Sequence, residues 1–217
     1  MLEIDLIRHA QSVANTRPDI IHGRMNHSPL SALGFLQCEA LDARLQNENQ
    51  AYDKIYSSTA VRAVQTRKHG LKSQLNEKYA TESEQLLELD QGDFVGRNRV
   101  EVYTPKTIAE IAKDPWNFKP KNGESQSECG QRMWDFIDER RREYLSNNEG
   151  EHYKIAIVTH GLAIKCWIRK LLDFNPQYTW LLETRNTSIS RFTYRNLFGN
   201  YSWTINKIND AAHIKEN

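Results

Sequence analysis

The chain has 217 residues, with 29 Lys and Arg against 28 Asp and Glu, so its formal net charge is +1. A balance this even gives no general electrostatic attraction to nucleic acids or anionic membranes. No stretch approaches the ~20 apolar residues of a membrane-spanning helix, and the first residues lack the basic start and long apolar run of a signal peptide. We therefore expect a cytoplasmic protein that binds neither nucleic acid nor membrane.

The length suits one α/β domain, and no Pro-, Gly- or Ser-rich linker and no internal repeat divides the chain. We expect a single domain over residues 1–217. The three cysteines (Cys38, Cys129 and Cys166) lie far apart and form no CxxC pair, which argues against a disulfide framework or a thiolate zinc site. Five tryptophans and nine tyrosines fit either a core or a homodimer interface, so the oligomeric state stays open.

The first half of the chain alternates apolar runs with helical patterns. A run at 2–7 predicts a strand that ends at Arg8 and His9, and apolar spacings of three and four predict a helix over 31–47 with Ser31 as its N-cap. A second strand is expected at 52–56 and a third at about 85–89. The hydroxyls at 57–59 are expected to cap a helix that runs through Arg62 to about residue 71.

The second half continues this alternation. Residues 98–120 are expected to be helical but irregular, because three prolines interrupt them. Ser125 and Glu128 have capping-box spacing at the start of a long helix to about residue 145. The clearest strand, 154–159, leads into His160 and a helix over 162–172, and two more strands follow near 188–194 and 201–205. This alternation predicts an α/β fold with a largely parallel sheet and helices on both faces.

In such sheets ligands bind at the carboxyl ends of the strands, so the residues just after those ends are candidate site residues. A neutral imidazole nitrogen of His9 can attack phosphorus and hold the phosphoryl group as a phosphoramidate. Arg8 beside it can grip two phosphate oxygens. An Arg-His pair alone is more often a surface accident or a structural pair. Its place at the end of a buried strand favours function, because charged groups there are costly unless paired or used.

Three further residues suit phosphate chemistry. Arg62 lies one turn into a helix whose N-terminus favours anions, although an exposed helical arginine is the commoner case. Glu88 ends the third predicted strand, where a partly buried carboxyl can protonate a leaving alkoxide; Asp90 and Asp93 compete for this role. His160 stands at a helix start and can donate hydrogen bonds to a developing phosphoryl group, with a capping or core histidine as the alternative.

Metal and nucleotide chemistry find no support in the spacing of the residues. His9, His22 and His160 show neither HxxxH nor HxH spacing and no adjacent carboxylate pair, so no metal site is expected. The glycines form neither a Walker loop nor a dinucleotide fingerprint, and we expect no cofactor.

Taken together, these positions resemble the histidine phosphatase superfamily, the phosphoglycerate-mutase-like group, in its branch 1. The opening segment 6–15, with Arg8-His9-Ala10 and Asn15, looks like that family's RHG motif and downstream asparagine. Further blocks are similar in order along nearly the whole chain: 57–66, 87–96 with its acid, 123–125, 158–161 and the tail 208–214. Each block is weak alone, but five in order are a strong signal.

The resemblance implies a three-layer α/β/α sandwich with a mostly parallel central sheet. It implies that His9 carries the phosphoryl group, that Arg8, Arg62 and His160 form the phosphate pocket, and that Glu88 donates the proton. Further positions match residues that line the phosphate or substrate site in the family: Asn15, His22, Gly23 and Gly161. Two positions depart from the pattern. Ala10 replaces the usual glycine, which matters only if its backbone needs a positive φ, and Val95 replaces a frequent acidic residue.

The segment after Gly23 looks more like the phosphatase branch, so the sequence favours a metal-independent phosphatase of small phosphorylated metabolites. Two alternatives stay open. A cofactor-dependent phosphoglycerate mutase must keep water away from a bisphosphorylated intermediate, and a non-catalytic member would only bind phosphorylated ligands. Residues 96–123 are expected to form an inserted helical cap over the site, with four candidate substrate contacts: Trp116, Phe118, Lys119 and Lys121.

Overall fold

The computed structural model describes residues 1–74, 80–147 and 150–214, and these contain a mixed sheet of six strands. Its order is β3-β2-β4-β1-β5-β6, from β1 (Leu2–Arg8), β2 (Lys54–Ser58), β3 (Ala80–Ser83), β4 (Tyr153–Thr159), β5 (Ile189–Leu197) and β6 (Asn200–Asp210). The pairs β1–β4, β2–β4 and β2–β3 are parallel, whereas β5 is antiparallel to both β1 and β6. Only β5 therefore runs against the other described strands, and the predicted mostly parallel sheet is confirmed.

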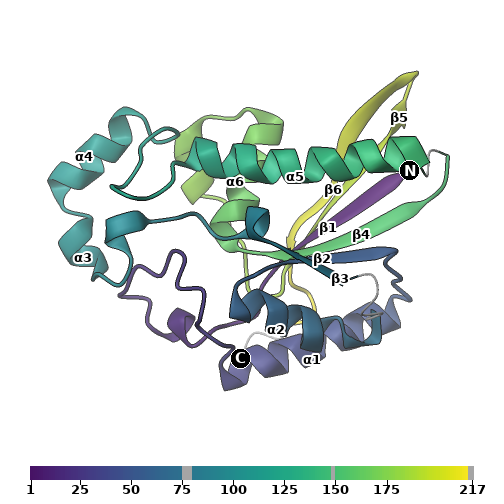
Figure 1. Ribbon diagram of the computed structural model, residues 1–217, viewed down its shortest axis with the longest axis horizontal. Coiled ribbons are helices and arrows are strands. Elements are labelled where there is room, and N and C mark those ends of the chain that lie inside the picture. Colours follow the sequence, from purple (N-terminus) through teal and green to yellow (C-terminus); the bar gives the residue numbers. More distant parts are fainter. Residues whose placement is uncertain (75–79, 148–149, 215–217) are drawn as a thin grey trace.

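Helices cover both faces of this sheet (Figure 1). On one side lie α1 (Ala32–Asn47) and α2 (Val61–Gly70), and on the other α5 (Gln126–Asn147) and α6 (Gly161–Leu172). Two apolar clusters fill the spaces between the layers, the larger under α5 and α6. The predicted three-layer α/β/α arrangement is confirmed.

Strand β1 contributes to both clusters because its side chains alternate. Leu2, Ile4 and Leu6 are completely buried in the cluster under α5 and α6, whereas Ile7 is completely buried in the cluster on the α1 side. Burial of each such side chain contributes about 1.5–3 kcal/mol. The strand is thus anchored from both faces, which holds Arg8 and His9 rigidly at its end.

Two predicted helix starts are confirmed in atomic detail. The Ser31 hydroxyl accepts a hydrogen bond from the Gly34 amide at 3.0 Å and caps α1. At α5, the Ser125 hydroxyl accepts from the Glu128 amide (3.2 Å), and the Glu128 carboxylate accepts from the Ser125 amide (2.8 Å). This reciprocal pair is the capping box that the spacing predicted.

The predicted hydroxyl cap of α2 is wrong. Strand β2 continues through Ser57 and Ser58, which are completely buried, and Ala60 precedes α2 without any side-chain cap. Pairing of Ser57 with β3 and β4 extends the strand beyond its apolar run. The Ser58 hydroxyl is therefore available to another partner.

The third strand was also placed wrongly. β3 is Ala80–Ser83, a mostly exposed edge strand, and Glu84–Leu86 forms a short 3₁₀ turn after it. The apolar Leu86, Leu87 and Leu89 that suggested a strand bury their side chains from an irregular segment instead. Glu88 consequently lies in a loop beyond the strand.

Segment 96–123 contains two helices, α3 (Arg99–Val102) and α4 (Pro105–Lys113), which lie together at one end of the molecule (Figure 1). Thr104 caps α4 through the Thr107 amide, and Pro105 occupies its first turn, where a proline is tolerated. Helical but irregular structure here is as expected. That the segment covers a bound substrate stays a prediction.

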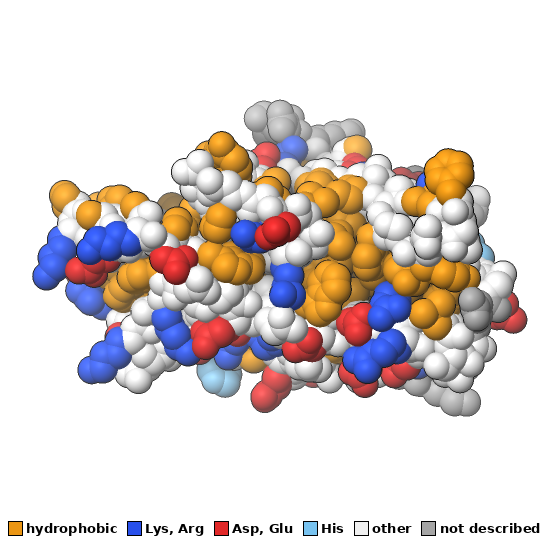
Figure 2. Space-filling model, turned by 90° about the horizontal axis from the view of Figure 1, so that it is seen from above, with side chains coloured by type: hydrophobic (Ala, Val, Ile, Leu, Met, Phe, Trp, Pro, Cys, Tyr) orange, Lys and Arg blue, Asp and Glu red, His pale blue; other side chains and the backbone are white. Residues whose placement is uncertain are grey.

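The surface carries charges of both signs. Across the face seen over α5, Lys and Arg side chains alternate with Asp and Glu, around apolar side chains gathered near the middle (Figure 2). None of the described helices combines the length and apolar character needed to cross a bilayer.

Candidate active site

A cavity of about 550 Å³ lies where β1 and β4 end. Eight of the nine residues singled out from the sequence line it: Arg8, His9, Asn15, His22, Gly23, Arg62, Glu88 and Gly161. The ninth, His160, is completely buried and lies beside His9, with the two ring centroids 5.1 Å apart. The fold thus gathers the predicted residues from five separate sequence segments.

The orientation of the His9 ring assigns its two nitrogens. Nδ1 lies 2.7 Å from the carbonyl oxygen of Ala10, and because a carbonyl can only accept, Nδ1 carries the proton. Nε2 accepts a hydrogen bond from Nε of Arg62 at 3.2 Å. Burial, then Arg62 and Arg8, lower the pKa of His9 well below its ordinary value. The ring is therefore neutral at pH 7, with the Nε2 lone pair beside a guanidinium.

Ala10 fits the turn after β1. It is absent from the residues with positive φ, so the glycine usual in the family is not needed for backbone conformation at this position. Its amide donates to the Thr66 hydroxyl at 2.9 Å, and that hydroxyl donates to the Arg62 carbonyl at 2.7 Å. The loop that carries His9 is thereby tied to the helix that carries Arg62.

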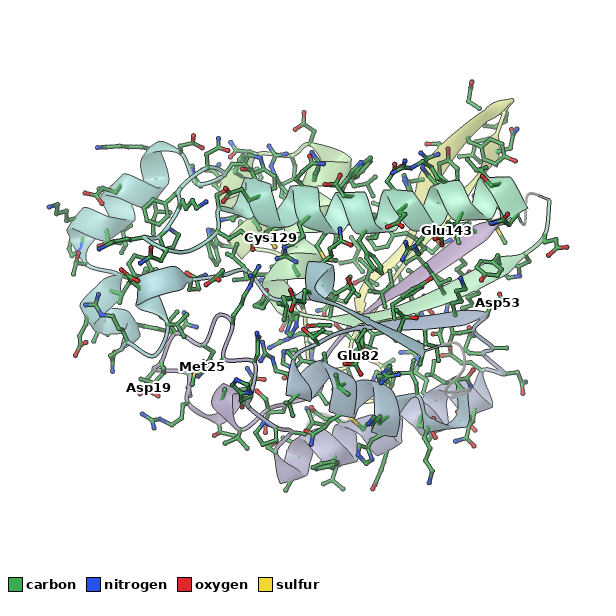
Figure 3. All side chains as sticks on the ribbon, viewed as in Figure 1. Asp19, Met25, Asp53, Glu82, Cys129 and Glu143 are labelled. Atoms are coloured by element: carbon green, nitrogen blue, oxygen red, sulfur yellow. The ribbon has the colours of Figure 1, made fainter. Side chains whose placement is uncertain are left out.

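Arg62 is nearly completely buried and is fixed from the loop between β1 and α1. Its Nη1 donates to the carbonyl of Met25, which Figure 3 labels on that loop, at 2.8 Å, and Nη2 donates to the Gly23 carbonyl at 3.4 Å. Gly23 has a φ of +43°, and a Cβ there would come within 2.9 Å of Val95. Glycine is required here for both reasons.

Arg8, the last residue of β1, also lines the cavity. Its Nη1 donates to the carbonyl of Thr184 at 2.6 Å, while its buried Nε has no partner among the described residues. A Cβ on Gly161 would lie 3.0 Å from the Thr184 hydroxyl and 3.4 Å from Arg8 Nε. Glycine at the start of α6 thus leaves room for the guanidinium, and an unpaired N–H remains for a phosphate oxygen.

The Glu88 carboxylate lies at the N-terminus of α6. Oε1 accepts from the amides of Leu89 (2.9 Å) and Ala163 (3.0 Å), and Oε2 accepts from the amide of Leu162 (3.2 Å). The two competitors do not line the cavity: Asp90 lies 3.6 Å from Arg24, and Asp93 accepts from Asn122. The structure thus favours Glu88 over Asp90 and Asp93, and one further carboxyl, that of Glu183, also lines the cavity.

An ionic cluster that the sequence did not reveal holds the Glu88 loop. Arg132 on α5 donates to the carbonyls of Gln85 (2.6 Å) and Leu87 (3.0 Å), and Arg24 donates to that of Glu88 (2.9 Å). Both arginines pair with Glu124, at 2.9 and 3.1 Å. The only sequence signal was the position of Glu124 in one of the family-like blocks.

His160 has one hydrogen-bonded nitrogen and one free nitrogen. Nε2 lies 2.8 Å from the hydroxyl of Ser58, and Nδ1 is buried with no partner among the described residues. Burial, followed by Arg62, His9 and Arg8, lowers the pKa of His160 well below its usual value. Like His9, it is a neutral imidazole.

Asn15 and His22 also line the cavity. The side-chain oxygen of Asn15 accepts two hydrogen bonds from Ser12, from the amide and the hydroxyl, both at 3.1 Å. This leaves the NH₂ group of Asn15 to donate. Burial, then Arg99 and Arg62, lower the pKa of His22.

Sequence reasoning missed several residues that line the cavity and belong to no motif. They are Lys165, segment 180–184, and Arg99 and Tyr103 of segment 96–123. Lys165 follows Gly161 by one helical turn, and this i,i+4 spacing was the available signal. For segment 180–184 the sequence held no signal.

None of the four candidate substrate contacts in segment 96–123 lines the cavity. Trp116 lies under the guanidinium of Arg169 (4.5 Å), and Phe118 lines a smaller adjoining cavity. Lys119 pairs with Glu128 at 2.7 Å, and Lys121 is largely exposed, 4.0 Å from Asp93. Packing and surface ion pairing account for all four.

No group of three or more His, Cys, Asp or Glu suited to hold a metal ion occurs in ranges 1–74, 80–147 and 150–214. The three cysteines are free and buried. Two arginines, Arg62 and Arg8, place positive charge near His9.

Comparison with known proteins agrees with this geometry. The family model of the histidine phosphatase superfamily, branch 1, matches residues 4–211. The chain belongs to this family. A probable phosphoglycerate mutase from Yersinia enterocolitica is 30% identical over 224 residues, which cover 99% of this chain and 95% of the relative. A protein of the same description from Yersinia pestis is 29% identical over the same shares.

Solved structures share the fold of this histidine phosphatase family member. A phosphoserine phosphatase from Entamoeba histolytica superimposes with a TM-score of 0.80 at 21% identity, covering 99% of this chain and 100% of that one. A mycobacterial glucosyl-3-phosphoglycerate phosphatase gives 0.76 at 20% identity, with coverage of 96% and 98%. The YhfR protein of Bacillus stearothermophilus gives 0.77 at 23%, covering 99% and 100%.

Proposed function

We propose that the protein is a phosphatase of small phosphomonoesters that works through a phosphohistidine on His9. The observation that carries this proposal is the His9 ring itself. Its Nδ1–H is bound to the Ala10 carbonyl, so the Nε2 lone pair is left at the cavity beside Arg62. A neutral, oriented imidazole next to fixed cations is what attack on a phosphate dianion requires.

In the first step the substrate phosphate binds between the guanidinium groups of Arg8 and Arg62. The Arg62 N–H that now bonds His9 turns to a phosphate oxygen, which frees the lone pair. Nε2 forms a bond to phosphorus while the bond from phosphorus to the ester oxygen breaks. Glu88, in its protonated form, gives its proton to the departing oxygen, and the alcohol leaves.

In the second step water attacks the phosphohistidine. The Glu88 carboxylate takes a proton from the water as its oxygen bonds to phosphorus, and the bond from Nε2 to phosphorus breaks. Inorganic phosphate leaves, and both His9 and Glu88 return to their starting states. The two arginines neutralise the charge on the transferring group, the task that metal ions perform in many other phosphoryl-transfer enzymes.

The direct test is to trap the intermediate. Mixing the protein with a ³²P-labelled phosphomonoester and quenching within milliseconds should leave label on the protein that is stable to base and lost in acid. His9→Ala should carry none. Absence of acid-labile label from an active wild-type enzyme would contradict the mechanism.

A cofactor-dependent phosphoglycerate mutase is the second candidate, and the Yersinia relatives named probable phosphoglycerate mutase favour it. The test is incubation with 3-phosphoglycerate and a trace of 2,3-bisphosphoglycerate. We expect slow release of free phosphate and little 2-phosphoglycerate. Fast interconversion with almost no free phosphate would establish the mutase instead.

A non-catalytic role in binding phosphorylated ligands is tested by hydrolysis of p-nitrophenyl phosphate. We expect turnover by wild type that is lost by at least about 1,000-fold in His9→Ala. Activity should persist in EDTA and be inhibited by vanadate, which adopts the five-coordinate geometry of the transferring phosphoryl group. Inactivation by EDTA that zinc or magnesium restores would point to a metal-dependent reaction.

A further inference from the structure

His9 and His160 must present different kinds of ring nitrogen to the phosphoryl group. His9 must present a lone pair to phosphorus, whereas a ring that stabilises the negatively charged oxygens must present an N–H. Both rings are neutral, because burial and the neighbouring arginines lower the pKa of each. In a neutral imidazole the hydrogen bond made by one nitrogen decides what the other nitrogen offers.

Ser58 makes that hydrogen bond for His160. Its side chain is completely buried at the end of β2, 2.8 Å from Nε2 of His160. The same hydroxyl oxygen accepts a hydrogen bond from the Ala60 amide at 3.2 Å. Among the described residues, Nε2 of His160 is the only acceptor within hydrogen-bond distance of the Ser58 O–H.

It follows that the Ser58 hydroxyl donates to Nε2, so the ring proton is on Nδ1. Nδ1 is buried and has no partner among the described residues. A buried donor without an acceptor is costly, and a ligand that binds beside it can supply the missing acceptor. The His160 ring lies next to His9, with centroids 5.1 Å apart, so the phosphoryl group on His9 is the nearby candidate acceptor.

We propose that Ser58 is a positioning residue that holds His160 in its Nδ1–H form, so that Nδ1 donates to the phosphoryl group as it moves to and from His9. The inference rests on the proposed function and deepens it. In the opposite arrangement Nε2–H would donate to Ser58 and Nδ1 would turn a lone pair toward the phosphoryl oxygens, which repels them. The direction of one buried hydrogen bond thus decides whether His160 assists the transfer or opposes it.

The tautomer is measured directly by ¹⁵N NMR of the histidine-labelled protein at pH 7.5. His160→Gln identifies the His160 signals among those of the seven histidines. We expect a protonated, pyrrole-like Nδ1 and an unprotonated, pyridine-like Nε2. A protonated Nε2 on His160 would overturn the proposal, whatever the enzyme hydrolyses.

Ser58→Ala removes the donor, and the adjacent Ser57 offers a matched control. Ser57 is completely buried in the same strand, and its hydroxyl has no partner among the described residues. We expect Ser58→Ala to lower kcat about 10-fold or more with KM changed less than about 3-fold, because the lost contact acts on the transition state. Ser57→Ala should stay within about 2-fold of wild type in both constants.

The NMR spectrum of Ser58→Ala separates this role from simple structural support. We expect its His160 signals to move toward the Nε2–H form or a mixture, while those of Ser57→Ala match wild type. Ser58→Thr keeps the hydroxyl and should restore the Nδ1–H signals. Loss of kcat in Ser58→Ala with an unchanged His160 tautomer would refute the positioning role.

Vanadate tests whether a phosphoryl-like oxygen accepts the hydrogen bond from Nδ1–H of His160. When vanadate binds, we expect the His160 Nδ1–H resonance of wild type to move downfield, and Ser58→Ala to bind vanadate at least about 5-fold more weakly than Ser57→Ala. An Nδ1–H signal that vanadate leaves unmoved would show that this proton serves no phosphoryl oxygen. If the tautomer is as proposed but no phosphomonoester is hydrolysed, then the proposed function fails and the assignment of the ring proton stands.

Discussion

At the scale of single residues, each reactive side chain depends on a neighbour that fixes its hydrogen bonds. The Ala10 carbonyl orients His9, and the amides at the start of α6 hold Glu88. Glu88 reaches the cavity at the N-terminus of α6, where the amides of Leu162 and Ala163 donate to it and suit the negative charge that it would carry after the proposed proton transfer.

The proposed role of Glu88 as proton donor predicts a dependence on the leaving group. In Glu88→Gln we expect kcat/KM for an alkyl phosphate to fall about 100-fold or more, because the alkoxide must be protonated as it leaves. For p-nitrophenyl phosphate the loss should be less than about 10-fold, because nitrophenolate departs without a proton. Steady-state kinetics with both substrates measure the difference.

Asp93→Asn is the control for this substitution. It makes the same chemical change at an exposed carboxylate that bonds Asn122 outside the cavity. Both substrates should be hydrolysed at the wild-type rate. A loss in Asp93→Asn that depends on the leaving group, or an equal loss for both substrates in Glu88→Gln, would assign the proton to another residue.

At the scale of elements, the loop after β3 is held by hydrogen bonds from arginine side chains rather than by strand pairing. Arg24 and Arg132 bind backbone carbonyls of this loop, and Glu124 joins the two arginines. The side chain of Glu124 is only 13% exposed. This cluster is the bridge from α5 to the segment that carries Glu88.

Glu124→Gln removes the carboxylate that Arg132 and Arg24 share, while Arg24 keeps Asp90 at 3.6 Å. We expect the free energy of unfolding to fall by about 2–3 kcal/mol, chiefly because the partly buried guanidinium of Arg132 loses its counter-ion. We also expect slower hydrolysis of alkyl phosphates, because Glu88 is less firmly placed. Urea denaturation and steady-state kinetics check the two effects.

Glu139→Gln provides the comparison, since Glu139 also pairs with an arginine but is 52% exposed. A pair with one well-exposed partner contributes at most about 1 kcal/mol, and Arg140 keeps Glu143 at 3.1 Å, so this variant should unfold almost as wild type does. Equal destabilisation by the two substitutions would show that the Glu124 cluster has no special part in holding the loop.

At the scale of the whole molecule, buried neutral histidines link stability to pH. The pKa values of His9 and His160 are lowered well below normal, mainly by burial, and that of His213 is lowered to about 4 by burial and Arg44. Below pH ~6.5 the unfolded chain takes up protons at these rings that the folded protein does not. Stability is therefore complete above this pH and falls as the pH drops toward the folded-state pKa values.

We expect the free energy of unfolding to be lower at pH 5.5 than at pH 7.5 by about 3 kcal/mol, because His9 and His160 each contribute about 1.4 kcal/mol over the one pH unit below 6.5 and the partly exposed His213 adds less. Urea denaturation across this range measures the slope. His9→Asn should make it shallower. A free energy of unfolding that rises toward pH 5.5 would contradict the neutral state of these rings.

The sequence alone predicted the architecture and the centre of the site. Apolar alternation and the 3.6-residue period are local properties, so the strand at 2–7, the helix at 31–47 and the capping box at Ser125 were all correct. Arg8, His9 and Arg62 were found because Arg8 ends a strand, His9 directly follows it and Arg62 lies in the first turn of a helix. Among family-level expectations, the place of Gly23 and Gly161 at the cavity also holds.

Only the tertiary structure decided how these residues act. Whether apolar residues near Glu88 form a strand or a loop depends on their neighbours in space, and there the hydrogen bonds that Arg24 and Arg132 donate to backbone carbonyls favour the loop. The cavity wall from segment 180–184 and the engagement of Trp116 with Arg169 depend in the same way on contacts between distant parts of the chain. The positions of the ring protons on His9 and His160 also depend on such contacts. A ring nitrogen is protonated or not according to the atom that the fold places within about 3 Å of it, and sequence spacing does not specify that atom.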